Sequence, residues 1–290
     1  MCVNKPQGLT SFDTLRKLKK GVPRIKLGHL GTLDPMATGV LPVAIGHATR
    51  LIEYIPDDTK TYIATMTLGG TSDTQDAWGE VTITRNTAFN ISSLENILKE
   101  YTGIINQIPP MYSAVHYEGQ RLYELARKGI SVDRAPRQVE IHSLKLLNIN
   151  SNAQGLPLVR LKIICSKGTY IRTLCHDIGQ SLGCGGYMSE LIRTQSGIFN
   201  IEQAQGLDDI LVKGVSACLL PLDYPLQTLA KIELAGNNEY KSILNGNPIY
   251  GYNDCRPGLV RVYYANKLIS IARCISNNER NVIKPLKVLK

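Results

Sequence analysis

The chain has 290 residues, of which 43 % are hydrophobic and 20 % are charged. These values are typical of a folded globular protein and exclude wholesale disorder. No apolar run approaches the roughly 20 residues of a membrane span, and no hydrophobic signal segment follows Met1. We therefore expect a cytoplasmic protein without membrane partners. The seven cysteines include no C-x-x-C pair, which predicts reduced, buried thiols and no metal site.

Positive charge is concentrated at the two ends of the chain. The net charge is +9. Residues 1–30 hold seven Lys or Arg against Asp13, and residues 241–290 hold nine against Asp254 and Glu279. The segment between them is therefore net negative. This distribution fits a polyanion laid across two surfaces, and it equally fits a basic face that only confers solubility.

The first predicted element is a helix over residues 11–20. Ser11 can cap it, and Phe12, Leu15 and Leu18 recur at helical spacing. The segment Gly28–Pro42 follows and contains three glycines and two prolines in fifteen residues. Such a composition predicts a shaped loop and neither a plain helix nor a plain strand.

Regular elements follow this loop. Alternation predicts a strand over residues 61–68, with Tyr62 at its margin and on one face with Ala64, Met66 and Leu68. The pattern Ser92-Ser93-Leu94-Glu95 is typical of a capping box and predicts a helix that ends at Gly103.

A strand, a tight turn and a helix are predicted next. Residues 158–165 alternate as a strand does, Lys167-Gly168 forms the turn, and a helical stripe runs from Ile171 to Leu182. Strands and helices mix without a regular βαβ rhythm, so we predict an α+β fold with a mixed, mainly antiparallel central sheet flanked by helices.

The remaining residues are typical of a linker and a small β module. The linker covers residues 219–225, and strands are predicted over 259–264, 268–273 and 283–289, the first two joined by a turn at 265–267. About 60 residues suffice for a small β-barrel or sandwich. We therefore predict two domains, residues 1–228 and 229–290.

Asp34 is the candidate reactive group of the glycine-rich loop. An aspartate before a proline commonly caps a turn. Glycoside hydrolysis uses two acidic groups, and the nearest acids in sequence, Asp13 and Glu53, belong to other segments. A single carboxylate can act as a nucleophile or stabilise a cationic sugar. It then needs a cationic partner, for which arginine is well suited, although the pattern alone does not say which arginine.

The Gly28–Pro42 segment resembles the catalytic motif of the TruB family of pseudouridine synthases. Four further segments resemble family motifs in the same order, so the resemblance covers nearly the whole chain. These segments are Asn4–Ser11, Thr71–Ala77, Pro109–Ala114 and Ser166–Leu174.

The resemblance implies the roles of the central residues. Asp34 would be the catalytic aspartate, and Arg172 would pair with it. Tyr62 would pack on the target base and help to remove its C5 proton. The fold implied is the pseudouridine synthase fold, with a C-terminal PUA domain that would contact the acceptor end of tRNA. A strand would precede Lys5, and because only four residues precede that lysine, either this strand is shortened or the start codon is placed late.

Four further residues receive binding roles from the resemblance. Tyr170 and Leu191 would line the uracil pocket. His29 would fill the space that the flipped base leaves or brace the loop, and Lys5 would support the Asp34 loop. The segment 109–129, rich in arginine and tyrosine, resembles the RNA-gripping insertion of the family.

The implied reaction is the isomerisation of uridine to pseudouridine at position 55 in the T-loop of tRNA. It neither adds a group nor changes oxidation state, so no cofactor is expected, and the sequence lacks a dinucleotide fingerprint. The expected partner is the tRNA T-arm, with no obligate protein partner and a monomeric enzyme. Two alternatives remain open: an RNA-binding protein that helps tRNA to fold, and a guide-RNA-dependent relative of the dyskerin type.

Overall fold

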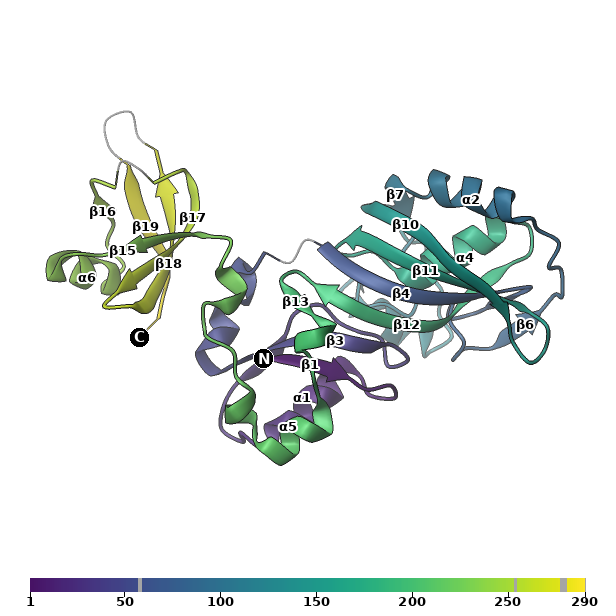
Figure 1. Ribbon diagram of the computed structural model, residues 1–290, viewed down its shortest axis with the longest axis horizontal. Coiled ribbons are helices and arrows are strands. Elements are labelled where there is room, and N and C mark those ends of the chain that lie inside the picture. The colour runs from purple at the N-terminus through teal and green to yellow at the C-terminus, as the bar shows by residue number, and fades with distance from the viewer. Residues whose placement is uncertain (57–58, 253–254, 277–280, 290) are drawn as a thin grey trace.

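The computed structural model describes residues 1–56, 59–252, 255–276 and 281–289, which form two large, separate sheets and two small hairpins (Figure 1). Asp254 and Glu279, which contribute to the charge of the C-terminal segment, lie outside the described residues. The larger sheet has ten strands, with the order β14-β1-β3-β12-β4-β11-β10-β7, and β2 and β13 pair with β3 and β12 beside this path. The smaller sheet has five strands.

The larger sheet is mixed and mainly antiparallel, as predicted. Only the β1–β14 and β3–β12 pairs among its described strands are parallel. Its strands are β1 (Cys2–Lys5), β2 (Leu27–His29), β3 (Thr38–Ile45), β4 (Thr59–Leu68), β7 (Gly103–Gln107), β10 (Arg137–Ser151), β11 (Pro157–Ser166), β12 (Gly186–Ser196), β13 (Phe199–Asn200) and β14 (Gln205–Gly206). Two small hairpins lie outside it, formed by β5 (Gly70–Ser72) with β6 (Val81–Ile83) and by β8 (His116–Tyr117) with β9 (Gln120–Arg121).

Strand β4 lies at the centre of the larger sheet. Tyr62, Ala64, Met66 and Leu68 all join the main hydrophobic core, as their alternation predicts. Tyr62 is the fourth residue of the strand, which begins at Thr59 and pairs on both sides with β12 and β11. The prediction that Tyr62 lies at the sheet margin was therefore wrong, because β4 begins two residues earlier than its apolar alternation indicates.

Helices α2 and α4 pack beside the larger sheet, and α1 and α5 lie together near β1 (Figure 1). The helices of the larger unit are α1 (Ser11–Lys19), α2 (Ile91–Glu100), α3 (Leu122–Ala126), α4 (Ile171–Ser181) and α5 (Leu207–Lys213). Two predicted caps were wrong. Thr10 caps α1 and forms a capping box with Asp13, and Asn90 caps α2. In both cases a capping residue one or two positions earlier lies in extended backbone, which the first helical residues cannot adopt.

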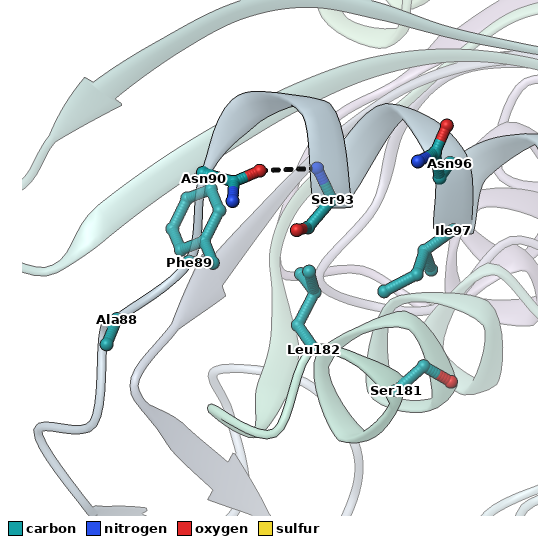
Figure 2. Close-up of a pocket in the computed structure, with 8 residues that line it drawn as sticks. All are labelled: Ala88, Phe89, Asn90, Ser93, Asn96, Ile97, Ser181 and Leu182. Atoms are coloured by element: carbon teal, nitrogen blue, oxygen red, sulfur yellow. Dashed lines mark hydrogen bonds between the residues drawn. The ribbon is translucent and has the colours of Figure 1, made fainter.

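A surface pocket lies between the first turns of α2 and the end of α4 (Figure 2). Its lining residues are Ala88, Phe89, Asn90, Ser93, Asn96, Ile97, Ser181 and Leu182. The Oδ1 atom of Asn90 accepts a hydrogen bond of 2.6 Å from the Ser93 backbone N–H at this pocket. None of the seven site residues expected from the sequence lines it.

The cysteines are free and, except for the half-buried Cys255, buried. Cys165 on β11 and Cys175 on α4 both belong to the main core. Burial raises the pKa of the Cys165 thiol to about 11 and that of Cys175 to about 12. Both thiols are therefore protonated and unreactive at neutral pH.

The smaller sheet forms a curled C-terminal module with its own hydrophobic core, which fits the expected PUA-like fold. Its strand order is β15-β17-β18-β19-β16. The elements are β15 (Ala230–Glu233), α6 (Asn237–Leu244), β16 (Ile249–Tyr250), β17 (Gly258–Tyr264), β18 (Lys267–Ile275) and β19 (Val282–Val288). The β17–β18 turn holds Ala265 and Asn266 at φ of 50° and 61°, the backbone form of a tight hairpin.

Polar and apolar contacts attach this module to the rest of the protein. Leu51, Leu226 and Ile271 form a small shared core. The Tyr263 hydroxyl donates to Asp223 Oδ2 at 2.5 Å, and Lys287 Nζ lies 2.8 Å from Glu53 Oε1. The linker is thereby fastened to β17, and β19 is fastened to the turn that contains Glu53.

Candidate active site

The loop between β2 and β3 carries Asp34 and is fastened on several sides. The Gly8 N–H donates to Pro35 O at 2.9 Å, and the Ala37 N–H closes a turn onto Asp34 O at 3.1 Å. Ser11 Oγ exchanges hydrogen bonds with the backbone N–H and C=O of Leu33 at 2.8 and 3.1 Å. The predicted shaped loop is shorter than Gly28–Pro42, because β2 and β3 take up its two ends. Its fixed centre presents Asp34, whose side chain is 35 % exposed.

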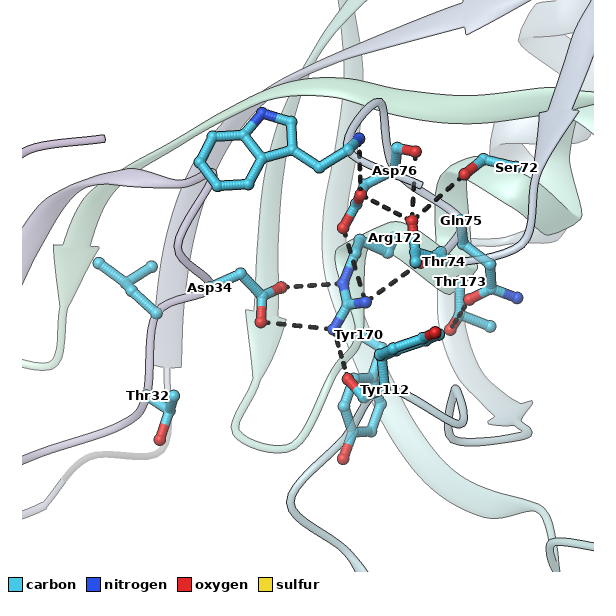
Figure 3. A network of polar contacts seen from close by, with 12 residues as sticks. Thr32, Asp34, Ser72, Thr74, Gln75, Asp76, Tyr112, Tyr170, Arg172 and Thr173 are labelled. Carbon is cyan, nitrogen blue, oxygen red and sulfur yellow. Dashed lines mark hydrogen bonds and ion pairs between the residues drawn. The ribbon is translucent and has the colours of Figure 1, made fainter. Parts of the chain in front are cut away.

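A buried arginine holds both oxygens of the Asp34 carboxylate (Figure 3). Arg172 Nε lies 2.9 Å from Asp34 Oδ2, and Arg172 Nη2 donates to Asp34 Oδ1 at 3.3 Å. Arg172 stands in the first turn of α4 with only 6 % of its side chain exposed. The guanidinium is always protonated and matches a carboxylate in shape. It therefore fixes the orientation of Asp34 and leaves one side of the carboxylate open to solvent.

Further contacts fix the arginine itself. Its Nη1 donates to Thr74 O at 3.1 Å, and its Nη2 donates to Tyr112 O at 2.9 Å. Nη1 also lies 3.6 Å from Oδ2 of the buried Asp76 (Figure 3). Asp76 was not predicted as a site residue, although the segment 71–77 that contains it resembles a family motif. The arginine thus bridges two carboxylates that lie 42 residues apart in sequence.

Tyr62 is buried on the core side of β4, directly opposite Arg193 of β12. Burial raises the pKa of its phenol to about 12, and the Arg193 guanidinium opposes this shift, while the charge of Asp34 adds to it. The hydroxyl group is therefore un-ionised at neutral pH.

Lys5 lies beneath the Asp34 loop with its side chain completely buried. Its Nζ donates to Pro6 O and Leu9 O, both at 2.8 Å, and to Pro35 O at 3.4 Å. Burial lowers the pKa of Lys5 to about 8, and Asp34 opposes this shift. The ammonium group therefore joins the backbone that precedes α1 to the residue that follows Asp34.

The other three expected residues lie at the end of β2, at the start of α4 and on β12. His29 ends β2, and burial together with the Arg193 cation lowers its pKa, which favours the neutral imidazole. Within the described part of the chain its buried Nδ1 has no hydrogen-bond partner. Tyr170 caps α4, and its backbone N–H and C=O pair with the Gln107 side chain at 3.0 and 3.2 Å. Leu191 lies on β12 opposite Ala64, inside the main core.

Arg193 is a second buried arginine, and it was not predicted as a site residue. Its side chain is completely buried, and its nitrogens donate to Val40 O at 2.7 Å, Gly31 O at 3.0 Å and Thr32 O at 3.3 Å. It therefore holds both flanks of the Asp34 loop. The sequence feature that could have indicated Arg193 is its position two residues after Leu191, since alternate strand residues share a face.

Three features are absent from the described residues. No group of three or more His, Cys, Asp or Glu side chains is placed to hold a metal ion. None of the helices in these ranges combines the length and apolar composition that a bilayer crossing requires. Neither described pocket is lined by Asp34 or Arg172.

The sequence matches two family models that together extend over most of the chain. Residues 16–171 match the model described as TruB family pseudouridylate synthase (N terminal domain), and residues 172–227 match tRNA pseudouridylate synthase B C-terminal domain. Both models end before residue 228, so the predicted domain boundary there stays a prediction.

Curated relatives and solved structures agree with this match. The chain is 52 % identical to tRNA pseudouridine synthase B of Syntrophomonas wolfei, over 99 % of this chain and 97 % of that protein. It is 41 % identical to the protein of the same name from Clostridium kluyveri, with 93 % of each covered. A chain in the crystal structure of a Cbf5-Nop10-Gar1 complex shares the fold, with a TM-score of 0.71, 25 % identity, and coverage of 100 % of this chain and 83 % of that one. The protein therefore belongs to the TruB family of pseudouridine synthases.

Proposed function

We propose that this protein is a tRNA pseudouridine synthase that converts uridine 55 in the T-loop of tRNA to pseudouridine. The observation that carries the proposal is the ion pair of Asp34 with the buried Arg172, which holds both oxygens of one partly exposed carboxylate. The two curated relatives bear the name tRNA pseudouridine synthase B. Tyr170, Leu191, His29 and Lys5 complete the proposed site.

The reaction begins when the uridine leaves its stack and enters the site, at a cost of a few kcal/mol. The bond between uracil N1 and ribose C1′ breaks, and Asp34 attacks or stabilises the ribose carbon as the base departs. The base turns in place, C5 bonds to C1′, and the C5 proton leaves while N1 gains a proton. The atoms of substrate and product balance, so the residues of this chain need add no group.

The other site residues act by position. Arg172 orients the carboxylate, and Tyr62 packs on the base as it turns, with its hydroxyl protonated at neutral pH because its pKa is about 12. Tyr170 and Leu191 line the uracil pocket. His29, whose Nδ1 is buried, takes the space of the flipped base or braces the loop, and Lys5 holds Pro35 from below.

The basic ends of the chain would bind the RNA backbone. We assign residues 229–290 to a separate PUA-like domain that contacts the acceptor end, because they contain a second core and a second basic segment. The enzyme is proposed to act in the cytoplasm as a monomer without an obligate protein partner. The structural relative comes from a complex with Nop10 and Gar1, and a guide-RNA-dependent enzyme is the alternative to a stand-alone one.

The decisive experiment uses the pure protein, a minimal T-arm stem-loop and no additives, and maps pseudouridine at single-nucleotide resolution. We expect conversion by the wild type and no conversion by Asp34→Asn, while the RNA affinity of the variant stays within a few-fold. Conversion by the variant would refute the role of Asp34. Tight binding without conversion by the wild type would favour the alternative of an RNA-binding protein that helps tRNA to fold.

A further inference from the structure

Trp78 is an exposed aromatic residue next to the active site that no role assigned above explains. It is the only tryptophan of the chain, and 53 % of its surface is exposed. Tryptophan is usually buried over most of its area. It lies in the turn between β5 and β6, two residues after Asp76.

The turn that presents Trp78 is rigid. The Trp78 backbone N–H donates to Asp76 Oδ1 at 3.0 Å, and the Ala77 N–H donates to Met188 O at 2.9 Å. The Glu80 N–H donates to Asp73 Oδ1 at 2.7 Å. A Cβ atom on Gly79 would lie 2.1 Å from that same oxygen, so a side chain there would have to displace the Asp73 carboxylate. A turn held in this way fixes the point from which the indole projects, so its backbone loses little conformational freedom when a ligand binds.

One carboxylate connects this turn to the reacting group. Asp76 Oδ1 accepts from the Trp78 backbone, and Asp76 Oδ2 lies 3.6 Å from Arg172 Nη1 (Figure 3). Arg172 in turn holds Asp34. The position of the Trp78 backbone is therefore fixed by the same ionic network that fixes Asp34.

The charge of the turn decides which part of an RNA it can contact. Residues 71–80 include Asp73, Asp76 and Glu80 and no lysine or arginine. This acidic turn repels phosphate groups, whereas the face of an indole stacks on any unpaired base. We propose that Trp78 stacks on an unpaired nucleobase of the substrate RNA beside the flipped uridine. The inference rests on the proposed function, because it takes the substrate to be a folded RNA with an open loop.

The single tryptophan permits a direct test by fluorescence. Asp34→Asn protein, which leaves the substrate unconverted, is titrated with the T-arm stem-loop. We expect a saturating loss of indole emission, because a stacked base quenches it. A blunt RNA duplex of the same length, which offers phosphates and no unpaired base, should bind at low salt without this loss. Unchanged emission in a complex that forms with the stem-loop would overturn the inference.

Affinity measurements separate stacking from a structural role. Trp78→Ala should weaken stem-loop binding about tenfold, and Trp78→Phe should retain most of the affinity. The control Ile104→Ala truncates a residue that is 67 % exposed on the edge strand β7, and it should leave the stem-loop affinity unchanged. The salt dependence of binding should be the same for Trp78→Ala as for the wild type, because no phosphate contact is lost.

The outcomes distinguish this inference from the proposed function. If the wild type converts the stem-loop and Trp78→Ala binds it as tightly, the stacking inference fails and the function stands. A shallower salt slope in Trp78→Ala would also refute stacking, since it would show a phosphate contact. If the wild type neither binds nor converts the RNA, both fail together.

Discussion

Arg172 shows most directly how the residues of the site depend on one another. Its side chain pairs with Asp34 and Asp76 and donates to two carbonyls. We expect Arg172→Met to lower single-turnover pseudouridine formation at least about 100-fold and to cost about 3 kcal/mol of stability, because a buried carboxylate loses its partner. Urea titration and rate measurement on the same preparation check both effects.

Arg172→Lys is the matched variant for this prediction. It keeps the positive charge and loses the two-pronged geometry, so its rate should lie between those of the wild type and Arg172→Met. A near-normal rate in Arg172→Met would show that another cation serves Asp34.

The lowered pKa of Lys5 predicts that the free energy of unfolding depends on pH. Burial lowers its pKa from 10.5 to about 8 in the folded protein. The folded state therefore binds this proton less tightly than the unfolded chain does. Burying the ammonium group lowers the free energy of unfolding by its full amount below pH 8. This destabilisation disappears as the pH rises from about 8 toward 10.5.

Lys5→Met provides the measurement, because it has no proton to release. Between pH 7 and pH 9.5 the free energy of unfolding of the wild type should rise by about 2 kcal/mol relative to that of Lys5→Met. Urea denaturation at several pH values gives this difference. Parallel curves for the two proteins would contradict the prediction.

The sequence could point to some of these residues and not to others. The pattern around Asp34 indicated a reactive carboxylate in need of a cation, and only the family resemblance indicated Arg172. Asp76 and Arg193 were missed because their roles arise from contacts across the fold. Asp76 reaches Arg172 through the turn after β5, and Arg193 reaches Gly31 and Val40 through strand pairing.

At the scale of elements, the approach of β3 to β12 depends on Gly39. Its φ is +104°, and a Cβ atom there would lie 2.2 Å from the carbonyl oxygen of Arg193. Gly39→Ala should therefore cost more than about 2 kcal/mol, since steric overlap adds to a strain of roughly 1 kcal/mol. It should also reduce activity, because β3 leads directly from the Asp34 loop.

Gly103→Ala is the control for Gly39→Ala. Gly103 has a φ of +100°, and a Cβ atom at this position would meet no other atom within 4 Å. It should show the backbone strain alone and leave the rate of conversion unchanged. Equal losses of stability in the two variants would show that the contact with Arg193 costs nothing.

Strands and helices with clear periodicity were predicted well, and their ends and neighbours were not. The alternation of residues 158–165 and the stripe from Ile171 correspond to β11 and α4. The caps at Thr10 and Asn90 were missed because several residues near each helix start could serve. The central place of β4 was missed because strand order depends on pairings between segments far apart in sequence.

The charge distribution along the chain predicts salt-sensitive RNA binding. Positive charge lies at both ends of the chain, and each neutralised phosphate releases counterions. The dissociation constant for full-length tRNA should rise at least about tenfold between 50 and 200 mM salt. Fluorescence anisotropy with labelled tRNA measures it. An affinity that stays flat over this range would favour the interpretation of the basic ends as a solubilising surface.

The buried thiols of the main core have a practical consequence. Cys165 on β11 and Cys175 on α4 are both buried in this core, which must open before a reagent can reach them, and burial raises the pKa of both. Alkylation of these two sulfurs therefore counts opening events of the catalytic unit. Any ligand that holds the sheet and α4 together will therefore lower the rate at which these two sulfurs are alkylated.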